Sequence, residues 1–213
     1  MMKKTSFCLW LMALTSYCSA DVDYLQADSS VKCHTLETTS HLVTKLRPSC
    51  SNIGDGEIMQ SFLIKSSGPR FVRYAYKCCT PDKAHVIHQN IILHTGWHTY
   101  KNIVYLQYHR VQCMNKQFLM GFHMETRKRS PGNYEVRYTY KCFVPSVQVR
   151  RRTTCSTRYT NYVWATEGKQ RGTALRYHNV DCGVGMFLNG FILQRNAQLT
   201  FVRYQYWCCH VKH

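Results

Sequence analysis

The most regular pattern in the chain is an alternation of apolar and polar positions that occurs three times. It reads FVRYAYKCC at 71–79, EVRYTYKCF at 135–143 and FVRYQYWCC at 201–209. A period of two is typical of a β-strand that buries one face. Valine, two tyrosines and a cysteine would share the buried face of each stretch, which we call the closing strand. The other face would carry one equivalent arginine in each copy: Arg73, Arg137 and Arg203.

Each closing strand ends a longer unit in which the same features follow in the same order. A cysteine comes first, then a short apolar run, a polar turn, and the closing strand. The runs are short, rich in β-branched and aromatic residues, and bounded by turn residues, which favours strands over helices. Self-similar units of this kind are typical of a repeated supersecondary structure. The sequence predicts an all-β fold, with three related disulfide-stapled β repeats in one compact, pseudo-symmetric domain: repeat one at 21–80, repeat two at 81–146 and repeat three at 147–213.

Residues 1–20 have the pattern of a secretory signal peptide. Lys3 and Lys4 precede an apolar run at 7–14, and Cys18-Ser19-Ala20 forms a small-residue cleavage site. The apolar run is shorter than the roughly 20 residues that a membrane span needs, and no later stretch approaches that length. We therefore expect a secreted, extracellular protein with no transmembrane segment.

The cysteines beyond the predicted signal peptide form an even set, which in an oxidising compartment predicts disulfides. Repeats one and three each hold an early cysteine, and the closing strand of each ends in two adjacent cysteines. Repeat two lacks the early cysteine and the second cysteine of the adjacent pair. Because losing one partner of a bridge leaves an odd thiol, the two cysteines absent from repeat two should be partners of each other. The predicted pairs are Cys50–Cys78, Cys33–Cys79, Cys113–Cys142, Cys182–Cys208 and Cys155–Cys209.

The chain is strongly basic, with a formal net charge of +17. Such a protein meets polyanions readily, and outside the cell these are sulfated glycans and anionic cell surfaces rather than nucleic acid. Two basic runs stand out, and guanidinium groups match the geometry of sulfate. We interpret them as candidates for a heparin-type patch, with a solvated loop as the alternative: Arg127, Lys128 and Arg129, and Arg150, Arg151 and Arg152.

The equivalent arginines of the closing strands have two interpretations. Three matching arginines are consistent with a binding feature. Each is more simply explained by a structural hydrogen bond or ion pair beside its strand, with its stem covering apolar surface. We favour the structural explanation for Arg73, Arg137 and Arg203.

Catalysis has little support in the sequence. No nucleophile elbow, zinc-protease motif or phosphate-binding loop is present, and no carboxylates form a spaced pair suited to acid–base work. No Cys-x-x-Cys zinc pattern occurs either. Several histidines are solvated loop residues or, alternatively, a metal or pH-sensing group: His85, His88, His94, His98, His109, His210 and His213. We expect no catalytic residue, no cofactor and no metal site.

The repeat resembles that of the dermatopontin family, in which a cysteine, a Gly-containing apolar run and a charged turn precede an arginine-aromatic strand that ends in Cys or Cys-Cys. The family's Asp and Trp in that strand are replaced here by Val202 and Tyr204, and this chain is basic where the family is often acidic. The resemblance covers spaced fragments of 46–209. The matching positions, with their equivalents in the other repeats, are Cys182, Leu188, Gly190, Phe191, Arg203, Tyr204, Tyr206, Cys208 and Cys209.

The resemblance implies a secreted, non-enzymatic matrix or cell-adhesion protein whose partners are a glycosaminoglycan, a proteoglycan or a cell-surface glycan. A secreted defence or toxin-like effector, acting as a lectin or on membranes, is the alternative, and a weaker likeness to the membrane-binding modules of perforin-like proteins points that way. A secreted hydrolase is a third class. Trp97 and Trp164 either stack on sugars or belong to the core.

Overall fold

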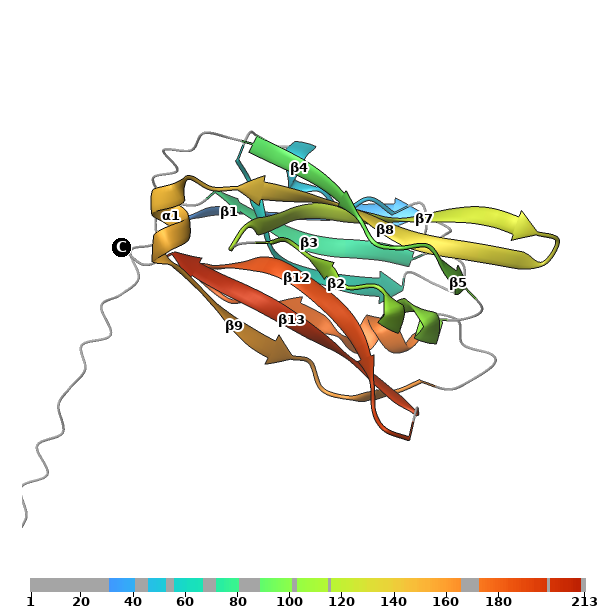
Figure 1. Ribbon diagram of the computed structural model, residues 1–213. Helices are drawn as coiled ribbons and strands as arrows, with labels where there is room; N and C mark the ends of the chain where they lie inside the picture. Colours follow the sequence, from blue (N-terminus) through green and yellow to red (C-terminus); the bar gives the residue numbers. More distant parts are fainter. Residues whose placement is uncertain are drawn as a thin grey trace, which may run out of the picture.

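The computed structural model describes residues 31–40, 46–52, 56–66, 72–80, 89–100, 103–114, 116–165, 173–198 and 200–211. The predicted signal peptide, together with His85, His88 and His213, lies outside the described residues. The described chain forms three antiparallel sheets, with α1 (Val147–Arg152) as its one α-helix (Figure 1). These sheets confirm the predicted all-β class. None of the helices in the described ranges is long and apolar enough to cross a membrane.

Each sheet is built around the closing strand of one repeat. The closing strands are β3 (Val72–Thr80), β8 (Asn133–Val144) and β13 (Phe201–Val211). On one side, each pairs with the apolar run of its own repeat: β2 (Ile58–Ser66), β7 (Phe118–Ser130) and β12 (Met186–Arg195). On the other side, each pairs with one or two strands from the start of its repeat: β1 (Lys32–Ser40), β4 (Gln89–His94) with β5 (His98–Tyr100), and β9 (Thr153–Tyr159) with β10 (Val163–Trp164).

The period-two pattern of the closing strands determines which side chains lie inside. The tyrosines and the cysteines that the pattern places on one face are buried in all three repeats. The equivalent arginines, Arg73, Arg137 and Arg203, lie half-buried on the outer faces of the sheets. The alternation therefore predicts both the strand and its orientation.

The three repeats exchange short segments with one another. In repeat three, β11 (Asn179–Asp181) pairs with β2 of repeat one. In repeat two, β6 (Val111–Gln112) pairs with β12 of repeat three. Ser49 of repeat one forms a bridge with Gly121 on β7 of repeat two. In each repeat, the segment before the cysteine that precedes the apolar run (Cys50, Cys113 or Cys182) thus pairs with the apolar strand of another repeat, and these pairings close into a ring.

Two glycines permit the close approach that this exchange requires. A Cβ atom on Gly190 would lie 2.2 Å from the Val111 carbonyl oxygen and 2.6 Å from the Gln112 Cα. A Cβ atom on Gly121 would lie 2.7 Å from the Pro48 carbonyl oxygen. Because these neighbours are backbone atoms, they cannot move away as a flexible side chain would. In repeat one the equivalent position is Ser61, which pairs with Asp181 of β11.

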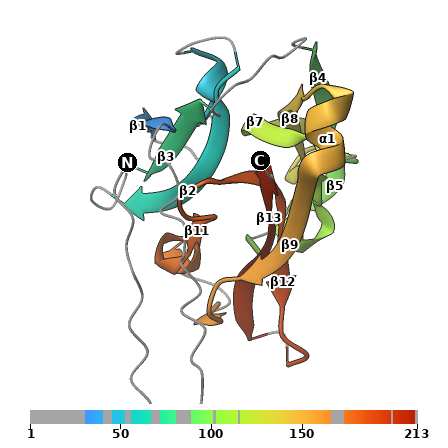
Figure 2. The same cartoon turned by 90° about the vertical axis from the view of Figure 1, so that its left-hand side faces the viewer.

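The main core is a ring of aromatic side chains contributed equally by the three sheets. Phe62, Phe122 and Phe191 occupy equivalent positions, and their ring centroids lie 4.8–5.0 Å apart in all three pairs. Each tyrosine of an outer set contacts a phenylalanine of the next repeat: Tyr74 with Phe122, Tyr138 with Phe191, and Tyr204 with Phe62. Tilted and edge-on contacts of this kind add to the burial of apolar area. Figure 2 shows the β1–β3–β2 sheet on one side of this centre and the other two sheets opposite it.

A second, smaller cluster lies beside the ends of the closing strands. It contains Phe118 and Phe187, in edge-on contact at 5.6 Å, with Cys79, Cys209 and Phe143. Phe143 takes the place of the second cysteine in repeat two. Its partner across the β4–β8 pair is Asn90, where repeats one and three have Cys33 and Cys155. An aromatic side chain therefore fills the space that a disulfide occupies in the other repeats.

Five disulfides occur among the described cysteines, and they join the same pairs that the comparison of the repeats predicts. Two of them, Cys33–Cys79 and Cys155–Cys209, link residues directly opposite each other on paired strands, with Cα atoms 4.1 and 4.0 Å apart. The other three join the start of an apolar run to its closing strand. Each of these bridges stays within one repeat, so the described repeats are connected to one another by strand pairing and packing and not by disulfides.

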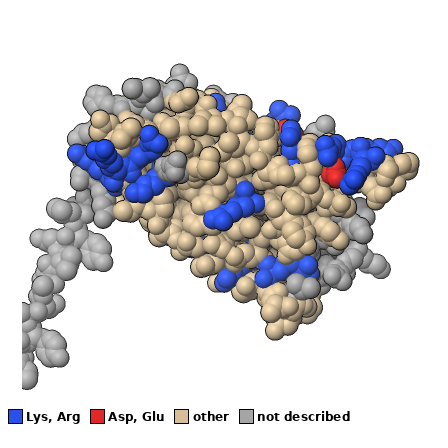
Figure 3. All heavy atoms as spheres, in the orientation of Figure 1, with Lys and Arg blue, Asp and Glu red and all other residues tan. Residues whose placement is uncertain are grey.

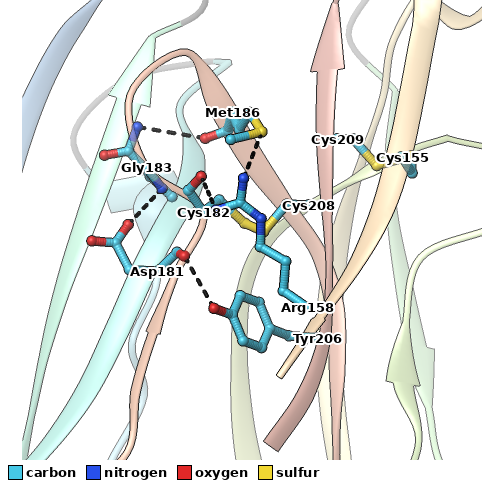
Figure 4. Close-up of a disulfide and its surroundings, with 10 residues drawn as sticks. Cys155, Arg158, Asp181, Cys182, Gly183, Met186, Tyr206, Cys208 and Cys209 are labelled. Carbon is cyan, nitrogen blue, oxygen red and sulfur yellow. Dashed lines mark hydrogen bonds between the residues drawn. A yellow bond between two sulfur atoms is a disulfide. The ribbon is translucent and has the colours of Figure 1, made fainter. Parts of the chain in front are cut away.

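Arg158 lies beside one of these bridges, as Figure 4 shows. Its guanidinium donates a hydrogen bond to the carbonyl oxygen of Cys182 at 2.9 Å and a weaker one to the sulfur of Met186 at 3.4 Å. Tyr206 donates to the carbonyl oxygen of the neighbouring Asp181 at 3.3 Å. Arg158 follows the second basic run in sequence, but these contacts give it a structural role at the Cys182–Cys208 bridge.

Candidate functional site

The two basic runs of the sequence lie at opposite ends of the molecule. Arg127, Lys128 and Arg129 lie near the turn between β7 and β8, whereas Arg150–Arg152 form the last turn of α1. Figure 1 shows α1 and this turn at opposite ends, and Figure 3 shows separate groups of basic atoms there. Strand β8 connects the two regions over 12 residues, or roughly 40 Å at about 3.3 Å per residue. The structure therefore does not bring the two runs together into one patch.

At the β7–β8 turn, two arginines share one buried carboxylate. The Nε atom of Arg127 donates to Glu135 at 2.7 Å, and an Nη atom of Arg129 lies 3.3 Å from the other oxygen of Glu135. The exposed fraction of the side chain is 8% for Glu135 but 52% for Arg127 and 72% for Arg129. Lys128 alternates to the other face of the strand and is exposed. One acid thus orients two guanidinium groups whose remaining N–H donors face solvent.

Trp97 contacts two of the guanidinium groups. The guanidinium carbon of Arg127 lies 4.4 Å from the centroid of the Trp97 ring, and that of Arg137 lies 4.6 Å from it. Trp97 is half-buried and belongs to the segment between β4 and β5, which packs beside the hairpin. Cation–π contacts favour flat stacking of arginine on tryptophan, which holds both guanidinium groups in place. We call Trp97, Arg127, Lys128, Arg129 and Arg137 the hairpin cluster.

Glu125, a carboxylate with a strongly lowered pKa, pairs with Arg137 of this cluster. Arg137 donates to Glu125 at 2.7 Å, and Thr139 donates to the same carboxylate at 2.8 Å. Burial by itself would raise the pKa of Glu125, but the hydrogen bonds from Arg137 and Thr139 and the charge of Arg137 lower it to about 2. Glu125 therefore stays ionised at any physiological pH. With Glu125 and Glu135 opposing three arginines and one lysine, the site keeps a net positive charge.

The α1 run has a different environment. Ser146 caps the helix by accepting a hydrogen bond from the backbone of Val149, and the three arginines follow in its last turn. Cations at the C-terminal end of a helix are favoured by its dipole. Arg151 and Arg152 are exposed, while Arg150 is half-buried. Within the described residues, no aromatic ring or carboxylate contacts this run, so its arginines are not oriented as those of the hairpin cluster are.

The equivalent arginines of the closing strands each have an identified partner. Arg73 forms an ion pair with Glu37 at 3.0 Å. Arg137 forms one with Glu125, as described above. Arg203 donates to the neutral side chain of Gln194 at 3.1 Å. These contacts are of the structural kind that the sequence favours for the three positions.

The structure places the described histidines in two settings. His94 is exposed and shares a hydrogen bond of 2.8 Å with Thr139, and the half-buried His98 stacks on Tyr108. His109, in contrast, is buried. In the described ranges, no group of three His, Cys, Asp or Glu side chains is arranged to hold a metal ion. His98 and His109 do lie edge to face, with their ring centroids 5.0 Å apart.

Sequence reasoning missed a pair of equivalent buried histidines. His109 lies 2.8 Å from the Thr95 hydroxyl through Nδ1, and His178 lies 2.8 Å from the Thr160 hydroxyl in the same way. Each threonine oxygen also accepts the backbone N–H of a closing strand, so each threonine links a buried ring to that strand. Burial lowers the pKa of both histidines to about 4, with the nearby His98 charge contributing for His109. The recurrence of Tyr-His at 108–109 and 177–178 is the sequence signal for this pair.

The tryptophans that the sequence leaves between two roles are not part of the core. Trp97 lies in the hairpin cluster, and 55% of Trp164 is exposed. Trp164 packs edge-on against Phe201 with the ring centroids 4.9 Å apart. Both rings are therefore accessible from solvent, on different sheets.

Comparison with known proteins adds no identity, because no family model matches the chain and a search of the curated proteins finds no match.

Proposed function

We propose that this is a secreted, non-enzymatic protein that binds sulfated glycans, as found on proteoglycans and cell surfaces, through the hairpin cluster. The observation that carries the proposal is the contact of Trp97 with both Arg127 and Arg137 beside an exposed Arg129, with Lys128 exposed on the other face of the strand. The five disulfides fit an extracellular protein. The resemblance to dermatopontin repeats supports a role in the matrix or in cell adhesion.

The geometry of the cluster favours specific binding of sulfate groups over a non-specific attraction to negative charge. A guanidinium group binds two oxygens of one sulfate through parallel hydrogen bonds, which an ammonium group does not. Stacking on Trp97 and pairing with Glu135 hold Arg127 before any ligand arrives, so less side-chain entropy is lost on binding. The basic residues follow one another along an extended hairpin, which suits a linear glycan with regularly spaced sulfates.

The test compares the two basic runs, because replacing three basic residues in either run removes the same charge from a different part of the molecule. The oxidised protein is eluted from immobilised heparin with a salt gradient, beside the variants R127S/K128S/R129S and R150S/R151S/R152S. We expect the first variant to elute at clearly lower salt than the parent and the second to elute close to the parent. Equal shifts of the two variants would show that overall charge, not the hairpin cluster, determines retention.

Two controls keep the result interpretable. Removing Arg127 leaves the buried Glu135 without its closest partner, so K128S/R129S serves as a second variant that retains Arg127. Circular dichroism then checks that each variant is folded. Elution by desulfated heparin at the same concentration as heparin would contradict the role of sulfate. Retention by anionic lipid vesicles, with leakage of their contents, would instead support the membrane-acting alternative.

A further inference from the structure

The outer face of the repeat-three sheet differs in chemistry from the corresponding faces of the other two repeats. It displays three aromatic rings that are 49%, 42% and 55% exposed, namely Tyr159, Tyr162 and Trp164. Between them lies Arg203, and beside Arg203 lie the amide side chains of Gln194 and Gln205. We call this set the aromatic face. Exposed aromatic rings bordered by polar groups are typical of a binding surface.

Register places these side chains on the same side of the sheet. Tyr159 pairs with Gln205 across β9 and β13, and Trp164 pairs with Phe201 across β10 and β13. Because Phe201, Arg203 and Gln205 alternate along β13, they share the face opposite the buried tyrosines. Tyr162 lies in the connection from β9 to β10 and reaches the same face, since its ring contacts Arg203.

Arg203 differs from its two equivalents because it has no acidic partner among the described residues. Arg73 faces Glu37, and Arg137 faces Glu125, whereas the position of Glu125 is Gln194 in repeat three. The guanidinium carbon of Arg203 lies 4.1 Å from the Tyr159 centroid and 4.5 Å from that of Tyr162. Gln194 accepts from Nε of Arg203 and donates to Gln205, so the amides orient the guanidinium without neutralising it.

We propose that the aromatic face binds a sugar residue that carries a carboxylate, that is, a uronic or a sialic acid. The fork of Arg203 matches a carboxylate, and the exposed rings suit the apolar faces of pyranoses. Gln205 and Gln194 supply the donors and acceptors that sugar hydroxyls need. Among the side chains of the aromatic face Arg203 is the one cation, and Arg110 stacks on Trp207 farther along β13. A ligand with a single carboxylate therefore suits these side chains better than a densely sulfated chain does, so we expect it to differ from the ligand of the hairpin cluster.

The polar groups on the aromatic rings favour a small polar ligand over the tails of a lipid as the occupant. Each exposed ring of the face carries a polar group, the phenol of Tyr159 and Tyr162 or the indole N–H of Trp164. An acyl chain offers these groups no hydrogen-bond partner. Flat amphipathic rings with one oriented charge suit a small polar ligand that stacks.

The experiment follows the indole N–H signals of the protein by NMR during titration with unsulfated sugars. The probes are a hyaluronan tetrasaccharide, which carries uronic acid, and 3′-sialyllactose, with chitobiose and lactose as neutral controls. A W164F variant assigns the Trp164 signal, and Trp97 reports independently on the hairpin cluster. We expect the Trp164 signal to shift with at least one acidic probe, at an affinity at least ten-fold above that for the neutral sugars.

The three equivalent arginines provide matched variants. We expect R203Q to weaken binding at least ten-fold and R73Q to leave it unchanged. R203K keeps the charge but not the fork, and should weaken binding nearly as much as R203Q does. Binding of one acidic probe alone would identify the source of the carboxylate and still support the proposal.

Several outcomes would overturn the proposal. These are no shift with either acidic probe, equal affinity for neutral sugars, full binding by a folded R203Q variant, or shifts confined to Trp97. The proposal does not depend on the hairpin cluster. R203Q should still elute from heparin close to the parent, and R127S/K128S/R129S should still bind the acidic sugar, so failure of one site is distinguishable from failure of the other.

Discussion

His109 and His178 are buried for a structural reason that cannot be inferred from the residue type alone. Each shares a hydrogen bond with a threonine hydroxyl that in turn accepts from the backbone of a closing strand. The Nε2 atoms of both rings have no hydrogen-bond partner among the described residues. Protonation would leave a charged ring in apolar surroundings, with an N–H at Nε2 that has no partner there. This cost explains why burial lowers the pKa of both rings.

This arrangement predicts a loss of stability in mild acid. In the folded protein both rings stay neutral down to about pH 4, whereas in the unfolded chain they take up protons near pH 6.5. The unfolded state therefore binds more protons in this window, so the free energy of unfolding falls as the pH drops from about 6.5 to about 4. The full effect is up to about 3 kcal/mol for each histidine. Urea unfolding at a series of pH values measures it.

The matched control is the double variant H109Q/H178Q, in which neither position titrates. It should be less stable than the parent at pH 7, and its stability should change much less between pH 6.5 and pH 4. Glu125 adds to the loss only at the acidic end of this window, because in the unfolded chain its carboxyl takes up a proton near its ordinary pKa of 4.5, whereas in the folded protein its pKa is about 2. The double variant keeps this contribution and removes that of the histidines. An unchanged pH dependence in the double variant would refute the assignment.

At the residue scale, the sequence predicts positions that a local pattern determines. The faces of Arg203 and Tyr204 follow from alternation, and the five disulfide pairs follow from comparing the repeats. The hydrogen bond between Thr95 and His109 does not follow, because 14 positions separate the two residues and no pattern links them. The contact of Trp97 with two arginines could not be predicted from the sequence either, since it depends on where the β4–β5 connection packs.

At the scale of elements, two of the three exchanged segments depend on glycine. We expect G190A to lower the free energy of unfolding by more than about 2 kcal/mol, because the new Cβ atom would collide with the backbone of β6. For a chain of this size the melting temperature should fall by roughly 4–8 °C. G96A is the control, since a Cβ atom there meets only the His98 side chain at an ordinary 3.5 Å. Equal stability of the two variants would contradict the close approach.

The strands that alternate over eight or more residues are predictable, and the exchanged ones are not. Strand β6 has two residues and β11 has three, too few to show a period. Their partners lie in other repeats, so no local turn specifies the pairing. Gly190 and Gly121 are the residues in the sequence that reflect this pairing between repeats. The separation of the two basic runs, in contrast, follows from the sequence, because the predicted closing strand at 135–143 lies between them.

At the scale of the whole molecule, the ring of exchanged segments predicts that no repeat is stable alone. Phe191 of repeat three packs on Phe62 and Phe122, and β12 pairs with β6 of repeat two. We expect the excised repeat three, with both of its disulfides formed, to give the narrow amide dispersion of an unfolded chain by NMR. The full chain should unfold in one transition seen alike by fluorescence and circular dichroism. A well-dispersed spectrum of the monomeric repeat would contradict this interdependence.

The closure of the ring also sets an order of events during synthesis. Strand β2 of repeat one needs β11 of repeat three as its neighbour, and β11 leaves the ribosome only after all of repeat two. Until then one edge of β2 has unpaired backbone groups, which invite pairing with another nascent chain. Contacts between such distant parts of a chain form slowly. Chains interrupted before repeat three should therefore aggregate in the cell even when the disulfides of their first two repeats are correctly formed.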